Sequence, residues 1–267
     1  MLNPKNWILR IIAWITLAFL FLPLILVVVT AFGKDPVITF PIHNFTWKWF
    51  GNIWAQPEFV IGFKMSFLTA FWASLLALLI GIPAVYALTR FELHHTSWFQ
   101  ALFLSPTLIP EIVIGFALYQ TLVIKLSWPL WPSLLVGHFL LCVPYVIRLV
   151  TSEMLLLDPH IEEAAWILGQ NRVVTFFSIV LPNIKTGLIA AFMLSFINSF
   201  NNIPITLFLN GPALNMLPTA ILNYLQNNYD PTVSAISVVL MLFTAILMFI
   251  IEKFLGVTTI RGDIKHG

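Results

Sequence analysis

Residues 163–182 read EAAWILGQNRVVTFFSIVLP, and this stretch separates two long apolar segments of the chain. The residues around its start predict a short helix with defined ends. Asp158 can accept hydrogen bonds as an N-cap, and Pro159 suits the first helical position because it loses no hydrogen bond there. Gly169 can end the helix, because glycine adopts the left-handed conformation at little cost. We therefore expect a helix of about ten residues from Pro159 to Gly169.

The predicted helix is amphipathic. Ile161, Ala164, Ala165 and Leu168 follow the i, i+3, i+4, i+7 spacing of one apolar stripe. A helix this short is not stable alone in water, so the stripe must rest on another surface. An ordinary connector lying on the bilayer or covering its own helix bundle would satisfy the same pattern. A second short helix is expected from about Arg172.

The composition is that of a membrane protein. Of the 267 residues, 60% are hydrophobic and 9% are charged, and the mean hydropathy is +0.94. A net charge of +2 without a basic patch argues against a nucleic-acid partner. Cys142 has no second cysteine to pair with and is expected to be a small buried residue. Apolar runs near the ~20 residues needed to cross a bilayer predict six spans: 9–32, 60–89, 98–124, 131–151, 180–209 and 232–251. We expect an all-α, polytopic, single transmembrane domain over residues 1–267.

Basic residues predict the orientation, because they gather on the cytoplasmic side of membrane proteins. Six spans place both termini on one side. With the termini inside, nine of the thirteen basic residues lie at or near the cytoplasm: Lys5, Arg10, Arg90, Arg148, Arg172, Lys185, Lys253, Arg261 and Lys265. The remaining four basic residues are then on the external side: Lys34, Lys48, Lys64 and Lys125. Segment 153–179 is then cytoplasmic, and tryptophans near the span ends are expected to be interfacial anchors: Trp47, Trp49, Trp54, Trp98, Trp128 and Trp131.

Four polar residues inside the apolar runs are candidates for a solute path. Glu111 follows Pro110 and is costly within a span. Ionised, it could attract an ammonium group, whereas neutral or capped it could stabilise a broken helix that starts at this point; we favour this structural role. Asn198 and Asn202 are four residues apart and are expected to share a helix face, with Asn201 beside them. They could line the path or hydrogen-bond between helices.

Other chemistry is not indicated by the sequence. His94 and His95, next to Glu92, fit a solvated loop better than a metal site, since adjacent side chains on a helix point apart. No glycine-rich phosphate loop, HExxH motif or nucleophile elbow is present. We expect no catalytic group, no metal site and no cofactor in this chain.

Glu163-Ala164-Ala165, Gly169 after three further residues, and Ile179-x-Leu181-Pro182 after nine more resemble the EAA loop of permease subunits in type I binding-protein-dependent ABC importers. The resemblance implies that the short helix is the coupling helix, which docks on a cytoplasmic ATPase. Its implied contact residues are Glu163, Ala164, Ala165 and Gly169, while Ile179, Leu181 and Pro182 would anchor the loop to span five. The bulky Trp166 and Ile167 occupy the variable positions.

Further motifs are similar to the second permease of the spermidine/putrescine branch: Pro110-Glu111-Ile112-Val113-x-Gly115, Leu194-Ser195-Phe196, Gly211-Pro212 and Leu217-Pro218. The resemblance implies a bacterial inner-membrane subunit paired with a second, different permease. Two ATPase subunits would bind ATP and Mg, and an external binding protein would deliver the small solute. A polyamine is the first expectation. Many relatives are acidic where Asn201-Asn202 stand, so a neutral or anionic solute stays open.

An intramembrane enzyme or a scaffold that uses Glu111 and the asparagines is the alternative from another class. It would function without a nucleotide-binding partner.

Overall fold

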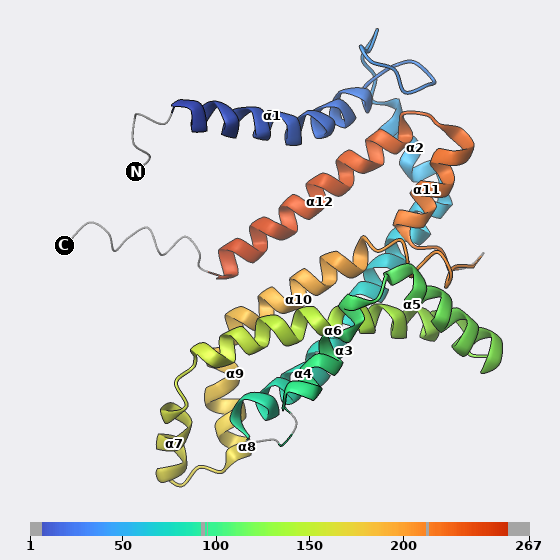
Figure 1. The fold of residues 1–267 in the computed structure, drawn as a ribbon. Helices are drawn as coiled ribbons and strands as arrows, with labels where there is room; N and C mark the ends of the chain where they lie inside the picture. Colours follow the sequence, from blue (N-terminus) through green and yellow to red (C-terminus); the bar gives the residue numbers. More distant parts are fainter. Residues whose placement is uncertain (1–6, 92–93, 95, 212–213, 256–267) are drawn as a thin grey trace. The chain divides into compact units, whose positions relative to one another are not determined.

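The computed structural model describes residues 7–91, 94, 96–211 and 214–255 (Figure 1). Predictions on Lys5, Glu92, His95, Pro212, Arg261 and Lys265 fall outside these residues, as do both chain ends. Helices dominate the described part, where β-pairing is limited to two isolated bridges, Gly33 with Phe45 and Gly211 with Leu214. The all-α prediction is confirmed.

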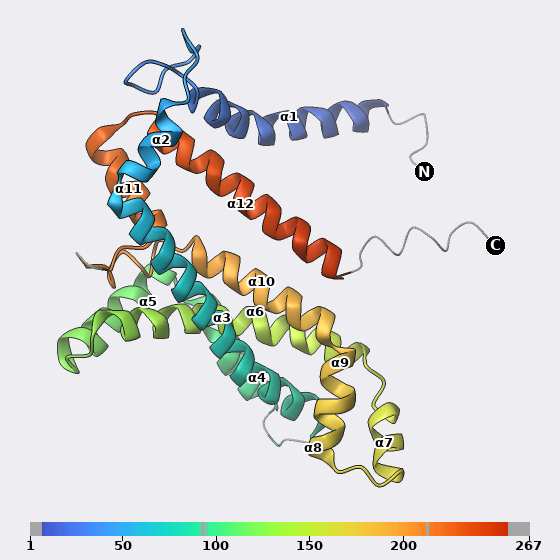
Figure 2. The same cartoon turned by 180° about the vertical axis from the view of Figure 1, so that it is seen from behind.

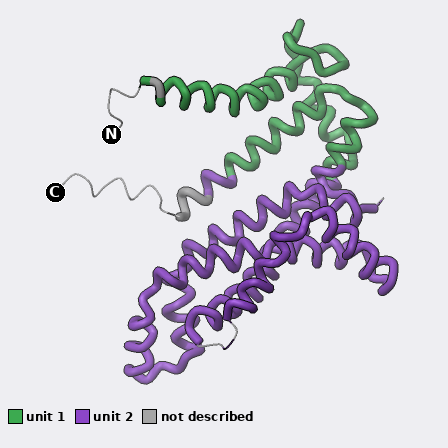
Figure 3. The backbone as a smooth tube through the Cα atoms, viewed as in Figure 1, with its two compact units in different colours: residues 1–60, 220–246 green, residues 61–219, 247–267 purple. Residues whose placement is uncertain are grey.

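The chain divides into two compact units (Figure 3). Unit 1 comprises residues 1–60 and 220–246, and unit 2 comprises residues 61–219 and 247–267. The helices are α1 (Trp7–Thr30), α2 (Lys48–Ala55), α3 (Pro57–Arg90), α4 (Thr96–Leu104), η1 (Ser105–Leu108), α5 (Glu111–Leu118), η2 (Tyr119–Lys125), α6 (Leu130–Leu156), α7 (His160–Ile167), α8 (Arg172–Thr175), η3 (Phe176–Val180), α9 (Leu181–Asn183), α10 (Lys185–Phe200), α11 (Leu217–Asn228) and α12 (Thr232–Leu255).

Four helices among the described residues are long and apolar enough to cross a membrane, and two bent helix pairs bring the total to six if each pair is one span. The four lie at Leu9–Thr30, Pro57–Arg90, Leu130–Leu156 and Thr232–Ile250. The predicted spans 98–124 and 180–209 are both interrupted. The first bends by 95° between Thr96–Leu108 and Glu111–Lys125, and the second by 70° between Arg172–Asn183 and Lys185–Phe200.

The ends of these helices have local causes. Pro110 has φ −55° and ψ 129°, so the chain is extended just before α5 begins. Helix α10 ends at Phe200, nine residues earlier than predicted, and residues 201–209 form turns. Pro204 disfavours a helical conformation at the residue before it. In addition, the side-chain amide oxygen of Asn202 accepts the Ile205 backbone N–H at 3.1 Å.

The core of unit 2 is built where small residues let helices approach closely. On α3, Ala73, Ser74 and Ala77 are fully buried, and a Cβ placed on Gly81 would lie 2.6 Å from Val146 Cγ1 of α6. Cys142 of α6 is buried, as expected. Helices α6 and α10 pack against each other. Figure 1 and Figure 2 both show α7 and α8 at one end of unit 2 and α5 towards the other.

Unit 1 joins the end of α1 to the start of α12. Thr30 and Ser234 share a hydrogen bond of 3.0 Å between their hydroxyl oxygens. The Trp49 indole donates to the Gly33 carbonyl at 2.6 Å and its side chain is buried. The expectation that Trp49 is an interfacial anchor is therefore wrong, because its N–H has an internal partner. Trp54, in contrast, is 75% exposed.

Candidate functional site

The start of α7 has the capping expected from the sequence. The Asp158 carboxylate accepts the His160 backbone N–H at 3.0 Å. Pro159 already has helical angles, with φ −59° and ψ −28°, and its carbonyl accepts the Glu162 N–H. The first four residues of the predicted 153–179 loop belong to α6, which continues to Leu156. The loop is thus shorter than predicted, while its helix starts at the predicted residues.

The end of α7 is a Schellman motif centred on Gly169. Gly169 has φ +88°, its N–H donates to the Trp166 carbonyl at 3.0 Å, and the Gln170 N–H donates to the Ala165 carbonyl at 3.0 Å. The positive φ is the conformation that glycine adopts most readily. The predicted helix stop is present at the predicted residue.

The predicted apolar stripe of α7 does not face the rest of the chain. Of its four residues only Ala165 is buried, whereas Ile161 and Leu168 are 44% and 84% exposed. The buried face instead carries Glu162 and Ala165. Neighbouring residues on a helix differ by about 100° in direction, so the helix is turned to bring Glu162 inward. The prediction considered apolar contacts alone and missed the polar partners of this glutamate.

Glu162 is held by two side chains of α3. Arg90 Nε lies 2.6 Å from Glu162 Oε1, and the Tyr86 hydroxyl donates to Oε2 at 2.9 Å. The side chains of Arg90 and Glu162 are only 10% and 1% exposed. Sequence reasoning missed this pair. The available signal was an arginine at the end of an apolar run, because a buried charge requires a partner.

The residues carried over from the EAA loop fall into two groups, one on and just after α7 and one in η3 and α9. Glu163 is 55% exposed and its carboxylate lies 2.9 Å from His160 Nδ1. This hydrogen bond, together with the charges of Asp158 and Glu163, raises the pKa of His160 above its ordinary value. Ala164 and Gly169 are also exposed.

Ile179, Leu181 and Pro182 lie in η3 and α9, directly before α10. Ile179 and Leu181 are half-buried, and the Ile179 carbonyl accepts the Asn183 side-chain N–H at 2.7 Å. Ile184, which follows, is buried. The segment thus connects α7 and α8 to α10 through a packed bend.

A second site, which we call the polar pocket, brings together all four candidate path residues. Its cavity of about 480 Å³ is lined by Glu111, Ile197, Asn198, Asn201, Asn202, Ile203 and Pro204. The Asn202 amide donates to Glu111 Oε2 at 2.6 Å, and the Asn198 amide donates to the Tyr145 hydroxyl at 2.6 Å. Asn201 is exposed. Because α10 ends at Phe200, the asparagines line the end of a helix rather than one continuous face.

Glu111 is the first residue of α5, so the helix break lies where the sequence placed it. The carboxylate is near the positive end of the helix dipole and is hydrogen-bonded by Asn202. This geometry fits a residue that stabilises the start of a broken helix. The same carboxylate lines the polar pocket, so it is also in place to meet a solute.

His138 of α6 is a further polar residue that sequence reasoning missed. It is fully buried, with Nδ1 2.7 Å from the Ser199 hydroxyl and Nε2 3.3 Å from the Thr206 hydroxyl. Thr206 in turn donates to the Asn202 carbonyl at 3.0 Å. His138 therefore fixes both the end of α10 and the turns after it against α6. The feature of the sequence that could have identified His138 is an ionisable side chain inside an apolar run.

Known proteins resemble the chain over most of its length, although no family model matches it. It is 26% identical over 239 residues to the putrescine transport system permease protein PotI of Escherichia coli K12, covering 87% of this chain and 85% of that one. Identity is 25% over 236 residues to the spermidine/putrescine permease protein PotC of Haemophilus influenzae, covering 88% and 91%. The chain is also 27% identical over 227 residues to the sulfate transport system permease protein CysT of Salmonella typhimurium, covering 79% of this chain and 82% of that one.

Solved structures show the same fold. A bacterial ABC transporter involved in import of the acidic polysaccharide alginate has a TM-score of 0.64 at 15% identity, covering 99% of both chains. The MetNI methionine ABC transporter in inward-facing conformations has a TM-score of 0.61 at 18% identity, covering 78% of this chain and 97% of that one. The chain is an ABC-importer permease. The predicted resemblance and the prediction of a transport subunit rather than an enzyme are confirmed.

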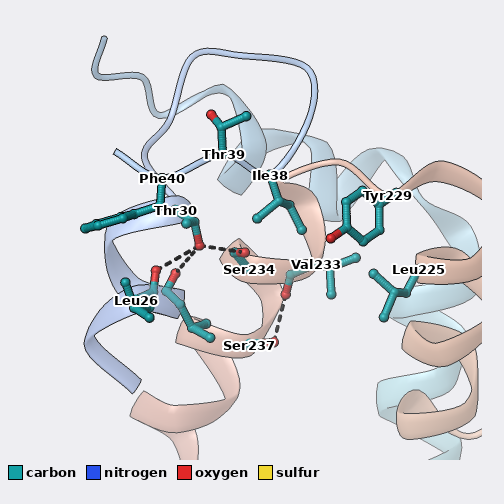
Figure 4. Close-up of a pocket in the computed structure, with 11 residues that line it drawn as sticks. Leu26, Thr30, Ile38, Thr39, Phe40, Leu225, Tyr229, Val233, Ser234 and Ser237 are labelled. Atoms are coloured by element: carbon teal, nitrogen blue, oxygen red, sulfur yellow. Dashed lines mark hydrogen bonds between the residues drawn. The ribbon is translucent and has the colours of Figure 1, made fainter. Parts of the chain in front are cut away.

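The permease has another cavity of about 460 Å³ within unit 1, between the end of α1, the loop after it, α11 and α12 (Figure 4). Its lining is largely apolar and includes the hydroxyl groups of Thr30, Tyr229 and Ser234. No candidate residue from the sequence lies in it. Over the described part of the chain, no group of three or more His, Cys, Asp or Glu residues is placed to hold a metal ion.

Proposed function

We propose that this permease forms one half of a heteromeric pair in a bacterial inner membrane, with both termini cytoplasmic. An external binding protein delivers a small solute, and two ATPase subunits, which bind ATP and Mg²⁺, drive its passage. The permeases named above for putrescine and for spermidine/putrescine support this assignment. The spacing of residues 163–182 supports the ATPase contact.

The observation that carries the proposal is the exposed face of α7. Its start is capped and its end is fixed by Gly169, yet Ile167 and Leu168 are 87% and 84% exposed. Large apolar side chains gathered on one small helix mark a surface that meets a partner. On the cytoplasmic side, that partner is the ATPase. The exposed Glu163, Ala164 and Gly169 form the contact, Ala165 is buried within this chain and supports it, and Ile179, Leu181 and Pro182 connect it to α10.

The polar pocket favours a cationic solute. Glu111 supplies a carboxylate, and the end of α10 supplies carbonyl groups at the negative end of a helix dipole. Asn198, Asn201 and Asn202 offer amide oxygens to ammonium groups, which have three N–H donors each. A diamine such as putrescine fits this chemistry. An anion such as sulfate, the substrate named for one relative, would meet the charge of Glu111.

Purification in mild detergent tests the ATPase partnership. We expect an ATPase with a Walker motif to co-purify with the intact chain, and ATP hydrolysis to accompany it. Repeated recovery of the intact chain without any nucleotide-binding subunit would contradict the proposal and favour the intramembrane enzyme or scaffold.

The variant Glu111→Gln tests the solute class. Glutamine can still accept the Asn202 hydrogen bond but lacks the charge, so the helix start is kept while attraction for a cation is lost. Loss of a charged hydrogen-bond partner is worth about 1.5–3 kcal/mol, so we expect the KM for radiolabelled putrescine to rise about tenfold or more. Thermal stability should stay near that of the parent. An unchanged KM would contradict the role of Glu111 in the path.

A further inference from the structure

The buried pair of Arg90 and Glu162 joins α7 to the spanning helices, and none of the residues carried over from the EAA loop belongs to it. We propose that Arg90 is the positioning residue through which a displacement of α7 reaches α3 and α6. This inference rests on the proposed docking of α7 on an ATPase.

Arg90 binds two elements with one rigid group. Its Nε lies 2.6 Å from Glu162 Oε1 of α7, and its Nη2 donates to the Leu157 carbonyl at 2.9 Å, directly after α6. The guanidinium is planar, so these two hydrogen bonds are fixed relative to each other. Tyr86, one turn earlier on α3, holds the second oxygen of Glu162 at 2.9 Å. Both oxygens of this carboxylate are therefore held by α3.

The burial of the pair makes the connection stiff. Glu162 is 1% exposed and Arg90 is 10% exposed. Separating a buried pair leaves uncompensated charge, which is strongly unfavourable. Helix α7 therefore cannot move away from the ends of α3 and α6 without a large loss of stability. It moves together with them.

Helix α6 carries this displacement to the polar pocket. Tyr145, near the middle of α6, accepts the hydrogen bond from Asn198, and His138, in the half that begins at Leu130, is bonded to Ser199. Asn198 lines the polar pocket, and Ser199 is the next residue of α10. The proposed route runs from α7 through Arg90 to α6 and then to the pocket, entirely within unit 2.

The test uses the complete transporter, with its partner permease and ATPases, in lipid nanodiscs. The parent carries Cys142→Ala and the reporter Asn201→Cys, and its labelling by a membrane-impermeant maleimide is timed with and without ATP plus vanadate. Asn201 is exposed and lines the polar pocket. We expect the parent's labelling rate to change about fivefold or more, in the range of typical couplings between sites. In Arg90→Met, ATP hydrolysis should persist while this change is lost.

Two further variants make the result decisive. Arg148→Met removes an exposed arginine of α6 and should respond to ATP like the parent. The double variant Arg90→Met with Glu162→Met leaves no stranded carboxylate, so it is expected to assemble even if the single variant does not, and it should lack the ATP-dependent change. An assembled variant without the pair that hydrolyses ATP and responds like the parent overturns this inference alone. A parent with no ATPase or no response to ATP overturns the proposed function, and this inference with it.

Discussion

Gly169 has a positive φ in open surroundings. Its φ is +88°, and an added Cβ would meet no atom within 4 Å. A substitution at this residue therefore strains the backbone without a steric clash inside this chain. The effect of such a substitution therefore reports the backbone conformation at the end of α7 and not the packing of this chain.

A three-variant series at Gly169 tests this residue. Alanine costs about 1–2 kcal/mol in the left-handed conformation, so Gly169→Ala should reduce solute uptake. Asparagine tolerates that conformation, so Gly169→Asn should retain most uptake. Gly169→Asp adds a charge to the proposed docking surface and should abolish uptake while the protein still inserts. Uptake assays with immunoblots of membrane fractions measure both properties. Parent-like uptake in the aspartate variant would rule out the assigned contact.

His160 gives a prediction on pH. The hydrogen bond to Glu163 and the charges of Asp158 and Glu163 raise its pKa, so the folded state favours the protonated ring. The resulting stabilisation is present below the ordinary pKa of 6.5 and is lost as pH rises through the higher folded-state pKa. Glu163→Gln should lower the pKa of His160, as followed by NMR titration of labelled histidine and assigned with His160→Gln. An unchanged pKa would show that the contact is absent in solution.

Residue-level prediction succeeded where the cause was local. Asp158 and Gly169 act on their own neighbours, so their roles follow from the order of residues along the chain. Glu162 and Trp49 were missed because their partners, Arg90 and the Gly33 carbonyl, are brought near by folding. The polar pocket lies between these cases, since its candidate residues were named but the hydrogen bond between Asn202 and Glu111 was not.

At the scale of elements, the difference between local causes and partners brought near by folding also explains which of the two bends was predicted. Pro110 marks one break in the sequence, and α5 begins directly after it. The early end of α10 was not predicted, because residues 203–209 are as apolar as a span. They are not helical, since Ile205 packs against Gly115 and Gly137 and nearby side chains satisfy the freed backbone groups. Hydropathy reports burial and does not distinguish a helix from packed turns.

The contact between α3 and α6 gives a prediction on stability. A Cβ on Gly81 would lie 2.6 Å from Val146, so Gly81→Ala should overpack this contact and cost about 1–3 kcal/mol. Val146→Ala in the same chain should recover much of that loss. Cys142 is the single cysteine and is buried, so its reaction with a thiol dye on heating reports unfolding. Equal midpoints for Gly81→Ala and the parent would contradict the close approach.

At the scale of the whole molecule, the two bent pairs decide the topology. If each pair is one span, position 126 is external and position 170 is cytoplasmic. If each pair enters and leaves on one side, these two assignments exchange. With the six-span arrangement, we expect Leu126→Cys to react with an impermeant maleimide from outside and Gln170→Cys from inside only. Each cysteine is introduced with Cys142→Ala and labelled in vesicles of known orientation.

A matched reporter checks the vesicles. Val37→Cys lies after the first predicted span and should react from outside in either arrangement, since both place it there. Labelling of position 126 from inside together with position 170 from outside would overturn the six-span prediction.

Because α6 is long, a small tilt of this helix displaces its residues by distances comparable to a hydrogen bond. Its 27 residues extend for about 40 Å, at 1.5 Å per residue. A rigid rod of this length that tilts by roughly 5° about one end moves its other end by about 3.5 Å and a residue near its middle, such as Tyr145, by about 1.5–2 Å. Hydrogen bonds such as that between Tyr145 and Asn198, at 2.6 Å, do not survive a change of that size. An angular change too small to alter the outline of the bundle is therefore enough to exchange the hydrogen-bond partners of the polar pocket.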